Sequence, residues 1–281
     1  ELKWNKMVVM LQKEVAERIV SNHGNKKYGK ISIMMQSFFD ESLGKNKVFV
    51  SSNPEFLKEG SAVSDFQKPD RIIIGTSNEN SKNIAKDLYQ PFNWSTNRMI
   101  YMSVGSAELT KYASNAFLAT KISFMNEMSL ICEHSGANIH EVRLGLGSDP
   151  RIGDSFLYAG LGYGGSCFPK DINALIDTQK KYNLESGILE KTKLVNDRQV
   201  KIFCKKILSK LTGNLSDKTL SIWGLSFKPN SDDVRESIAI KLVSILSPKV
   251  KFLNLYDPIS NKQAERALSK IDNVKFFNEK Y

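Results

Sequence analysis

The chain has 281 residues, of which 41% are hydrophobic and 25% charged, a length that suits two ordinary globular domains. Its formal net charge is +10, but the lysines are scattered and no zinc-finger or aromatic RNA-binding signature occurs, so we expect no nucleic-acid partner. No run approaches the roughly 20 apolar residues of a membrane span, and the start at Glu1 has no signal-peptide profile, so we expect a soluble protein without a membrane partner.

Residues 1–95 alternate helical and strand-like pieces. Residues 7–10 form a short apolar run, residues 13–21 have helical periodicity, and residues 47–51 and 71–75 have the composition of β-strands. Strands separated by helices indicate part of a parallel α/β sheet. We therefore predict a partial Rossmann-like sheet domain over residues 1–95.

Residues 96–212 have a helical pattern. Residues 107–135 contain neither Pro nor Gly and stop at Gly136, as expected of a helix that ends at a glycine. A second helix follows Pro169, and a third covers about residues 187–211. The first helix has apolar residues on more than one side, so we predict a central helical domain that forms a homodimer or higher homo-oligomer through it.

Residues 213–281 return to an α/β pattern. We predict a strand at 219–225, a helix at 233–246 that starts with Asp233 and Glu236 as a capping pair, and a strand at 251–256 ending in Asp257. About 60 residues are few for a complete doubly wound domain, so we expect a partial C-terminal Rossmann-like domain. The predicted fold class is α/β, with a helical domain between two partial sheet domains.

The cysteines and histidines bear on compartment and metal binding. Three cysteines at wide spacings, Cys132, Cys167 and Cys204, argue against a disulfide framework and for a reducing compartment, which we take to be the cytoplasm. The three histidines form no cluster with them, so we expect no metal site. Cys132 and Cys204 lie inside predicted helices among apolar residues and are expected in the core.

The most informative stretch is residues 160–171, Gly-Leu-Gly-Tyr-Gly-Gly-Ser-Cys-Phe-Pro-Lys-Asp. Three of its glycines fit a G-x-G-x-x-G dinucleotide fingerprint, but no strand precedes them and no acidic strand end lies about 20 residues on, so we disfavour that interpretation. With Pro169 as the first helical residue, Cys167 lies just before a helix N-terminus, where the partial positive charge favours a thiolate. The glycines would let a substrate approach the backbone, and Asp171 lies near the cysteine. Taken alone, a cysteine at such a junction is more often structural.

Two further groups of polar residues could serve a site. Lys111 and Asn115 are four residues apart on a predicted helix, so they share one face, which continues as an apolar stripe. The alternative for Lys111 is a lysine that snorkels at a helix edge. Glu55 and Glu59 follow a predicted strand, where α/β proteins place ligand loops, although isolated acids there are more often solvated charges at a helix start.

Taken together, these motifs resemble the UDP-glucose 6-dehydrogenase family, within the UDP-glucose/GDP-mannose dehydrogenases. The resemblance runs from about residue 47 to residue 257, and its segments occur in the family's order and spacing. These segments include Asn-Pro-Glu-Phe-Leu at 53–57, Pro-Asp-Arg-Ile-Ile-Ile-Gly at 69–75, Gly-Gly-Ser-Cys-Phe-Pro-Lys-Asp at 164–171 and Gly-Leu-Ser-Phe-Lys-Pro at 224–229. Residues 111–115, 151–153 and 234–237 also match.

The resemblance implies oxidation of UDP-glucose to UDP-glucuronate by two hydride transfers to NAD. Cys167 would attack the intermediate aldehyde to give a thiohemiacetal, whose oxidation yields a thioester that water hydrolyses. Lys111 and Asn115 would stabilise the developing oxyanion, and Lys111 would also assist deprotonation of the alcohol. Asp171 would help to position the cysteine and the water, and Glu55 matches the acid implicated in thioester hydrolysis.

The resemblance also implies binding residues. Glu59 and Arg235 would contact the cofactor, and Arg151 would reach the substrate across the dimer. The full set of implied substrate-binding residues is Phe56, Leu57, Arg151, Phe156, Tyr163, Gly164 and Lys228.

Three departures from the family pattern concern completeness. The family begins with a Gly-x-Gly-Tyr-Val-Gly loop that cradles the NAD pyrophosphate, and nothing before Glu1 supplies it. Residues 11–15 are Leu-Gln-Lys-Glu-Val where a Ser-Thr-Val-Pro-Val-Gly-Thr loop is expected, and the C-terminal sheet ends early. We therefore expect a chain incomplete for activity, whether as a fragment, an incomplete gene model or a degenerate relative.

Alternative functions remain open. The Pro-Asp-Arg sequence at 69–71 favours UDP-glucose over GDP-mannose, while a UDP-N-acetylhexosamine dehydrogenase is an alternative within the class. From a different class, the chain could be a non-catalytic dimerisation or sugar-nucleotide-binding module.

Overall fold

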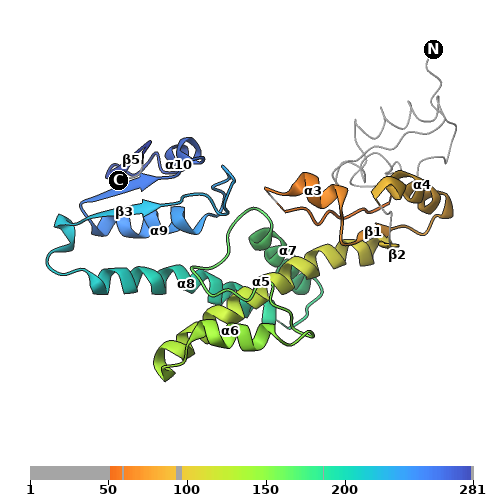
Figure 1. Cartoon of the computed structure of the whole chain (residues 1–281), viewed down its shortest axis with the longest axis horizontal. Helices are drawn as coiled ribbons and strands as arrows, with labels where there is room; N and C mark the ends of the chain where they lie inside the picture. Colours follow the sequence, from red (N-terminus) through yellow and green to blue (C-terminus); the bar gives the residue numbers. More distant parts are fainter. Residues whose placement is uncertain (1–50, 59, 93–96, 186, 280–281) are drawn as a thin grey trace, which may run out of the picture. The chain divides into compact units, whose positions relative to one another are not determined.

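The structure is a computed structural model that describes residues 51–58, 60–92, 97–185 and 187–279 (Figure 1). The chain divides into two compact units, Glu1–Lys111 and Tyr112–Tyr281. The predicted elements at residues 7–10 and 13–21, and all but the last residue of the strand at 47–51, lie outside the described residues. The predicted domain boundaries stay predictions.

The first unit contains a parallel pair of strands flanked by helices. β1 (Ile72–Gly75) pairs with β2 (Met99–Met102) in the register Ile72 to Met99. All four residues of β1 are buried, as expected of a strand covered on both faces. The flanking helices are α3 (Ala62–Gln67), α4 (Glu79–Tyr89) and the 3₁₀ turn η1 (Gln90–Phe92). The strand predicted at 71–75 is therefore confirmed, as is the parallel α/β pattern.

The segment before α3 is attached to β1 by hydrogen bonds. Ser52 and Gly75 exchange two backbone bonds of 2.9 and 2.7 Å in an isolated antiparallel bridge. The side chain of Asn53 donates to the carbonyl of Ile73 at 3.0 Å and accepts from the hydroxyl of Tyr89. These bonds fix the start of the segment that carries Glu55.

The longest helix, α5 (Val104–Ser135), confirms the helix predicted at 107–135, with a start three residues earlier. At about 1.5 Å per residue it is roughly 48 Å long. Gly136 has φ +78°, the left-handed conformation that ends a helix at glycine. The start of α5 packs so closely on β1 that a Cβ on Gly75 would lie 2.6 Å from the Cβ of Ala107, so this strand end requires glycine.

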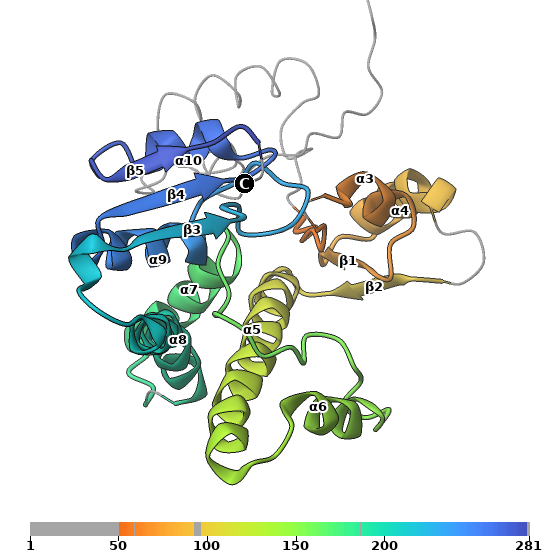
Figure 2. The ribbon, with the colours of Figure 1, turned by 60° about the vertical axis from the view of Figure 1, so that its left-hand side comes forward.

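The second unit continues with helices and ends in a three-stranded sheet (Figure 2). Its helices are α6 (Ile139–Gly147), α7 (Phe168–Lys181), α8 (Ile188–Lys210), α9 (Ile238–Leu246) and α10 (Asn261–Ala267), with short 3₁₀ turns η2 (Leu215–Asp217) and η3 (Ser247–Lys249). β3 (Thr219–Trp223), β4 (Phe252–Tyr256) and β5 (Val274–Phe276) pair in parallel in that order. These elements confirm the predicted third helix and the return to an α/β pattern.

One apolar core joins this sheet to its helices. Leu253 and Leu255 of β4 are fully buried against Val243 of α9, and Cys204 of α8 lies in the same cluster. Cys132 is also buried, so both cysteines expected in the core are there. Among the described helices, none is both long and apolar enough to cross a membrane.

The helix predicted at 233–246 begins five residues late, at Ile238. Asp233 does not cap a helix, because its carboxylate accepts from the backbone N–H and guanidinium of Arg235 and so closes a turn. Glu236 follows with φ +52°, outside helical geometry. Ser237 precedes the helix and donates its hydroxyl proton to the carbonyl of Leu225 at 2.7 Å. A capping pattern was present in the sequence, but local turn bonds and tertiary contacts determine the structure.

Candidate active site

A first cluster of predicted site residues lies in the first unit, around Lys111. The ammonium of Lys111 donates to the backbone carbonyl of Glu55 and lies 3.0 Å from its carboxylate Oε1. The Lys111 side chain is only 17% exposed, so its charged end is held by Glu55 instead of extending into solvent. This pairing argues against the snorkelling alternative.

The ring of Phe56 contacts two cations in the same cluster. The guanidinium of Arg71 lies 3.9 Å from its ring centroid, and the ammonium of Lys111 lies 5.4 Å from it. Leu57 is 38% exposed, and its backbone N–H donates to Oε2 of Glu55 at 2.8 Å. The cluster therefore combines one carboxylate, two cations and an aromatic face, which suits a polar ligand with an anionic part.

Cys167 lies at the start of α7 in the second unit. It occupies the N-cap position, one residue before Phe168, and its side chain is exposed. Pro169 is the second helical residue and not the first, so the prediction was one residue out. The hydroxyl of Ser166 lies 3.7 Å from Sγ of Cys167. An exposed sulfur beside the positive end of a 14-residue helix has the position that a nucleophilic cysteine requires.

Asp171 lies one turn into α7 and is 1% exposed. Its Oδ2 accepts a 2.6 Å hydrogen bond from the side-chain amide of Asn115, and its backbone N–H donates to the carbonyl of Cys167. The ammonium of Lys170 lies 3.1 Å from Oδ1, although the direction of approach does not satisfy hydrogen-bond geometry there. Burial alone would lower the pKa of Lys170, but the attraction of Asp171, with smaller effects of Tyr112 and Cys167, raises it. Cys167, Asp171 and Asn115 are thus connected through α7.

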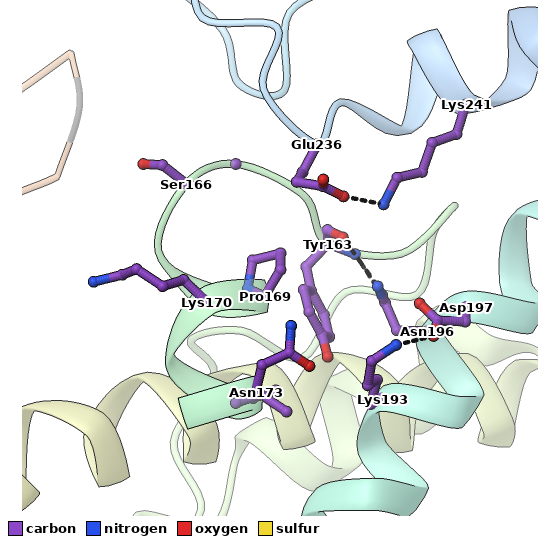
Figure 3. Close-up of a pocket in the computed structure, with 12 residues that line it drawn as sticks. Tyr163, Ser166, Pro169, Lys170, Asn173, Lys193, Asn196, Asp197, Glu236 and Lys241 are labelled. Atoms are coloured by element: carbon purple, nitrogen blue, oxygen red, sulfur yellow. Dashed lines mark hydrogen bonds and ion pairs between the residues drawn. The ribbon is translucent and has the colours of Figure 1, made fainter. Parts of the chain in front are cut away.

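A cavity of about 280 Å³ is lined by Ser166, the residue before Cys167. It lies between the loop before α7, α7 itself, α8 and the segment before α9 (Figure 3). Burial, with a smaller effect of the Asp197 charge, raises the pKa of Tyr163 far above its usual value, so its hydroxyl stays protonated. Three lysines and two acids give the lining a mixed charge: Lys170, Lys193, Lys241, Asp197 and Glu236.

The glycines before Cys167 are approached by the chain's own residues. A Cβ on Gly164 would lie 2.3 Å from the carbonyl oxygen of Glu236, and one on Gly165 would lie 2.5 Å from the ring of Phe227. We expected these glycines to admit a substrate, but at these two positions they admit the segment before α9. That segment includes Lys228 and Arg235, two of the predicted binding residues.

Three domains of one family match the chain in order. The NAD binding domain of the UDP-glucose/GDP-mannose dehydrogenase family matches residues 8–93, the central domain residues 105–198, and the UDP binding domain residues 221–281.

The chain belongs to the UDP-glucose/GDP-mannose dehydrogenase family.

Individual relatives agree with this assignment. The chain is 46% identical over 215 residues to a UDP-glucose 6-dehydrogenase of Pseudomonas aeruginosa, a match that covers 76% of this chain and 48% of the relative. A solved UDP-glucose dehydrogenase from Pyrobaculum islandicum has a TM-score of 0.78 at 38% identity and is covered to 56%, with 88% of this chain. A UDP-D-ManNAc dehydrogenase from Pyrococcus horikoshii has a TM-score of 0.68 at 25% identity and is covered to 60%, again with 88% of this chain. The chain spans about half the length of the curated relatives it matches.

Other site residues expected from the UDP-glucose/GDP-mannose dehydrogenase pattern make local contacts. Arg151 is exposed, and its guanidinium binds the carboxylate of Asp149, two residues earlier. Phe156 has φ +63°, and its ring lies 6.1 Å from that of Phe168. Arg235 binds Asp233, and Glu59 lies outside the described residues.

Sequence reasoning missed three side chains that contact the loop before α7. Asn126 of α5 and Asn196 and Gln199 of α8 are buried amides that bind the loop backbone. The signal was the spacing of Asn196 and Gln199, three residues apart on one helical face that also carries apolar residues. Long amides on a buried face need hydrogen-bond partners, and a loop without regular structure supplies them.

Proposed function

We propose that the chain is part of an NAD-dependent UDP-glucose 6-dehydrogenase that oxidises UDP-glucose to UDP-glucuronate in the cytoplasm, where its three free cysteines stay reduced. The observation that carries the proposal is the exposed Cys167 at the N-terminus of α7, connected through Asp171 to Asn115, in a chain 46% identical to a UDP-glucose 6-dehydrogenase. The second hydride must leave a tetrahedral adduct of the aldehyde, and an accessible thiol at a helix start is suited to form such an adduct.

Two NAD molecules, bound one after the other, would each accept one of the two hydrides of the reaction. The pairing of β1 and β2 is compatible with a dinucleotide site. The two strands are parallel, and doubly wound sheets bind such ligands at the carboxyl ends of their strands, which here are Gly75 and Met102. The family's NAD binding domain also matches residues 8–93. By resemblance, Glu59 and Arg235 would contact the cofactor.

The proposed roles of the chain's own residues follow the reaction. Lys111, held by Glu55, would assist deprotonation of the primary alcohol by stabilising the alkoxide with its positive charge. The same charge would stabilise the oxyanion that forms when Sγ of Cys167 adds to the aldehyde carbon. Oxidation of that thiohemiacetal gives a thioester on Cys167. A water activated by Glu55 or Asp171 would then break the carbon–sulfur bond, releasing the carboxylate and restoring the thiol. Asn115 would hold Asp171 in place.

UDP-glucose is the substrate that the comparisons favour. Identity reaches 46% with a UDP-glucose 6-dehydrogenase and 38% with a solved UDP-glucose dehydrogenase, against 25% with a UDP-D-ManNAc dehydrogenase. Within the chain, Arg71 of the Pro-Asp-Arg sequence stacks on Phe56 beside Lys111. A UDP-N-acetylhexosamine remains the second candidate substrate.

We also propose that two copies associate through α5. Phe117, Phe124 and Ile131 recur every seven residues on this helix and are 67, 47 and 56% exposed. Residues seven apart fall on one side of a helix, so the three side chains form an apolar stripe of the kind that a second copy covers.

Calorimetric titration of the chain with UDP-glucose, UDP-N-acetylglucosamine and GDP-mannose tests the proposal. We expect UDP-glucose to bind most tightly. Tighter binding of UDP-N-acetylglucosamine would change the proposed substrate to that sugar nucleotide, while the proposed reaction class would stay the same. If all three fail to bind while the chain is folded by circular dichroism, the proposed function is wrong.

A further inference from the structure

The loop that leads to Cys167 is held in an unusual way. We call residues 154–166 the glycine loop. Within the described part of the chain, this loop makes no hydrogen bond from backbone to backbone. Its backbone instead makes four hydrogen bonds to side chains, and all four go to the amides of three residues on α5 and α8. The shape of the loop therefore depends on these amides.

Two of the amides bind the backbone N–H and the carbonyl of the same residue, Gly160. Oδ1 of Asn126 accepts from the backbone N–H of Gly160 at 2.7 Å, and Nε2 of Gln199 donates to the carbonyl oxygen of Gly160 at 2.8 Å. Asn126 comes from α5 and Gln199 from α8. Gly160 is thus fixed between the two helices.

The third amide binds both backbone groups of Tyr163 (Figure 3). Oδ1 of Asn196 accepts from the N–H of Tyr163 at 2.7 Å, and Nδ2 donates to its carbonyl at 3.1 Å. This geometry requires the glycine beside it. Gly162 has φ +109°, and a Cβ there would lie 2.7 Å from Oδ1 of Asn196. Between the two fixed residues, the N–H groups of Leu161 and Gly162 have no partner among the described residues.

The three amides are aligned by a buried polar seam between the helices. The hydroxyl of Ser123 on α5 donates to the carbonyl of Thr192 on α8 at 2.9 Å, and Thr120 and Thr192 share a 3.0 Å hydroxyl contact. These bonds fix the register of α5 against α8 one turn before Asn126 and Asn196. The three loop-binding amides are only 0 to 8% exposed: Asn126, Asn196 and Gln199.

The amides leave polar atoms unsatisfied. Nδ2 of Asn126 and Oε1 of Gln199 are buried without a hydrogen-bond partner in the part of the chain that the structure describes. Buried polar atoms without partners destabilise a fold, and apolar side chains at these positions would avoid that penalty. Apolar side chains, however, could not bind the backbone of Gly160 as these amides do.

We propose that Asn126, Asn196 and Gln199 are positioning residues that set the shape of the glycine loop for binding a nucleotide sugar. By binding the backbone groups of Gly160 and Tyr163, they fix the stretch between these two residues, where the N–H groups of Leu161 and Gly162 can donate to an anionic diphosphate. The inference rests on the proposed function, since it is that function which brings a nucleotide sugar to this loop.

The test compares Asn196→Ala and Gln199→Ala with a matched control. Asn273 also binds backbone with its side-chain amide, which donates to the carbonyls of Ser247 and Val250, but it does so beside β5. Asn273→Ala should therefore lower stability without affecting the glycine loop. Two readouts on the full chain are needed: hydrogen exchange of the peptide covering residues 155–166, and calorimetric affinity for UDP-glucose.

We expect both loop variants to exchange faster in that peptide and to bind UDP-glucose roughly tenfold more weakly, since each loses at least one hydrogen bond to the loop backbone. Asn273→Ala should match the unaltered chain in both readouts. Unchanged exchange in both variants would overturn the inference, and so would faster exchange with unaltered affinity. Failure of the unaltered chain to bind UDP-glucose would refute the proposed function instead, while the exchange comparison would still decide whether the amides hold the loop.

Discussion

Replacing Asn115 by alanine tests how much its hydrogen bond to the carboxylate of Asp171 contributes to the stability of the second unit. Asp171 is 1% exposed, and Asn115 provides the only side-chain hydrogen bond that its carboxylate receives within the described residues. A hydrogen bond to a charged group contributes roughly 1.5–3 kcal/mol, and without Asn115 the buried carboxylate would keep only its ion pair with Lys170 at 3.1 Å. We therefore expect Asn115→Ala to lower the free energy of unfolding by about 2–3 kcal/mol.

The assay is urea unfolding at neutral pH of the unaltered chain, Asn115→Ala, Asp171→Ala and the double variant. Because the two side chains contact each other, the double variant should lose about 1.5–3 kcal/mol less than the sum of the single losses. Asn173→Ala is the matched control, because Asn173 is an exposed amide on α7, the helix that carries Asp171, and it should change stability by less than about 0.5 kcal/mol. A loss below about 0.5 kcal/mol for Asn115→Ala, or strict additivity in the cycle, would refute this reasoning.

Three further predictions concern pH, assembly and reactivity. Burial alone would raise the pKa of Asp257, but hydrogen bonds from four backbone N–H groups lower this pKa below 3.8. The ionised carboxylate therefore stabilises the fold above pH 3.8, and this contribution is lost as the pH falls through the lowered pKa. Asp257→Asn should thus destabilise the chain at pH 7, and unfolding curves of variant and parent should converge toward about pH 2. Phe124→Asp should turn a dimer into a monomer in sedimentation at micromolar concentration, and a well-folded monomer of the unaltered chain would argue against the α5 interface. At neutral pH iodoacetamide should label the exposed Cys167 well before the buried Cys132 and Cys204, and equal labelling of all three would contradict the structure.

Much of the fold follows from local signals in the sequence. A run without Pro or Gly that ends at Gly136 defines α5, and Pro169 locates the start of α7 to within one residue. The segment before α9 shows why other elements could not be predicted. Asp233 and Glu236 have the spacing of a helix cap, yet the turn closed by Arg235 and the close packing of Glu236 on Gly164 prevent a helix there. That packing joins residues more than 70 positions apart, which no local pattern reveals.

The candidate site was predictable to a similar extent. The spacing of Cys167 and Asp171 predicted that they share one helical turn, and the periodicity of α5 predicted one face for Lys111 and Asn115. The partners of these residues were not predictable, because Glu55 reaches Lys111 from 56 positions away and Asp171 reaches Asn115 from the same separation. The amides that hold the glycine loop depend on the register of α5 against α8, a tertiary feature.

The most direct test of the account is product formation with and without the thiol of Cys167. The chain, alone and joined to the N-terminal segment of the Pseudomonas aeruginosa relative, is incubated with UDP-glucose and NAD, and NADH and UDP-glucuronate are quantified together. A protein with Cys167 should form two NADH for each UDP-glucuronate, because an alcohol becomes an acid through two oxidations, and Cys167→Ser should form no acid. Formation of UDP-glucuronate by Cys167→Ser at the rate of the unaltered protein would contradict the covalent account.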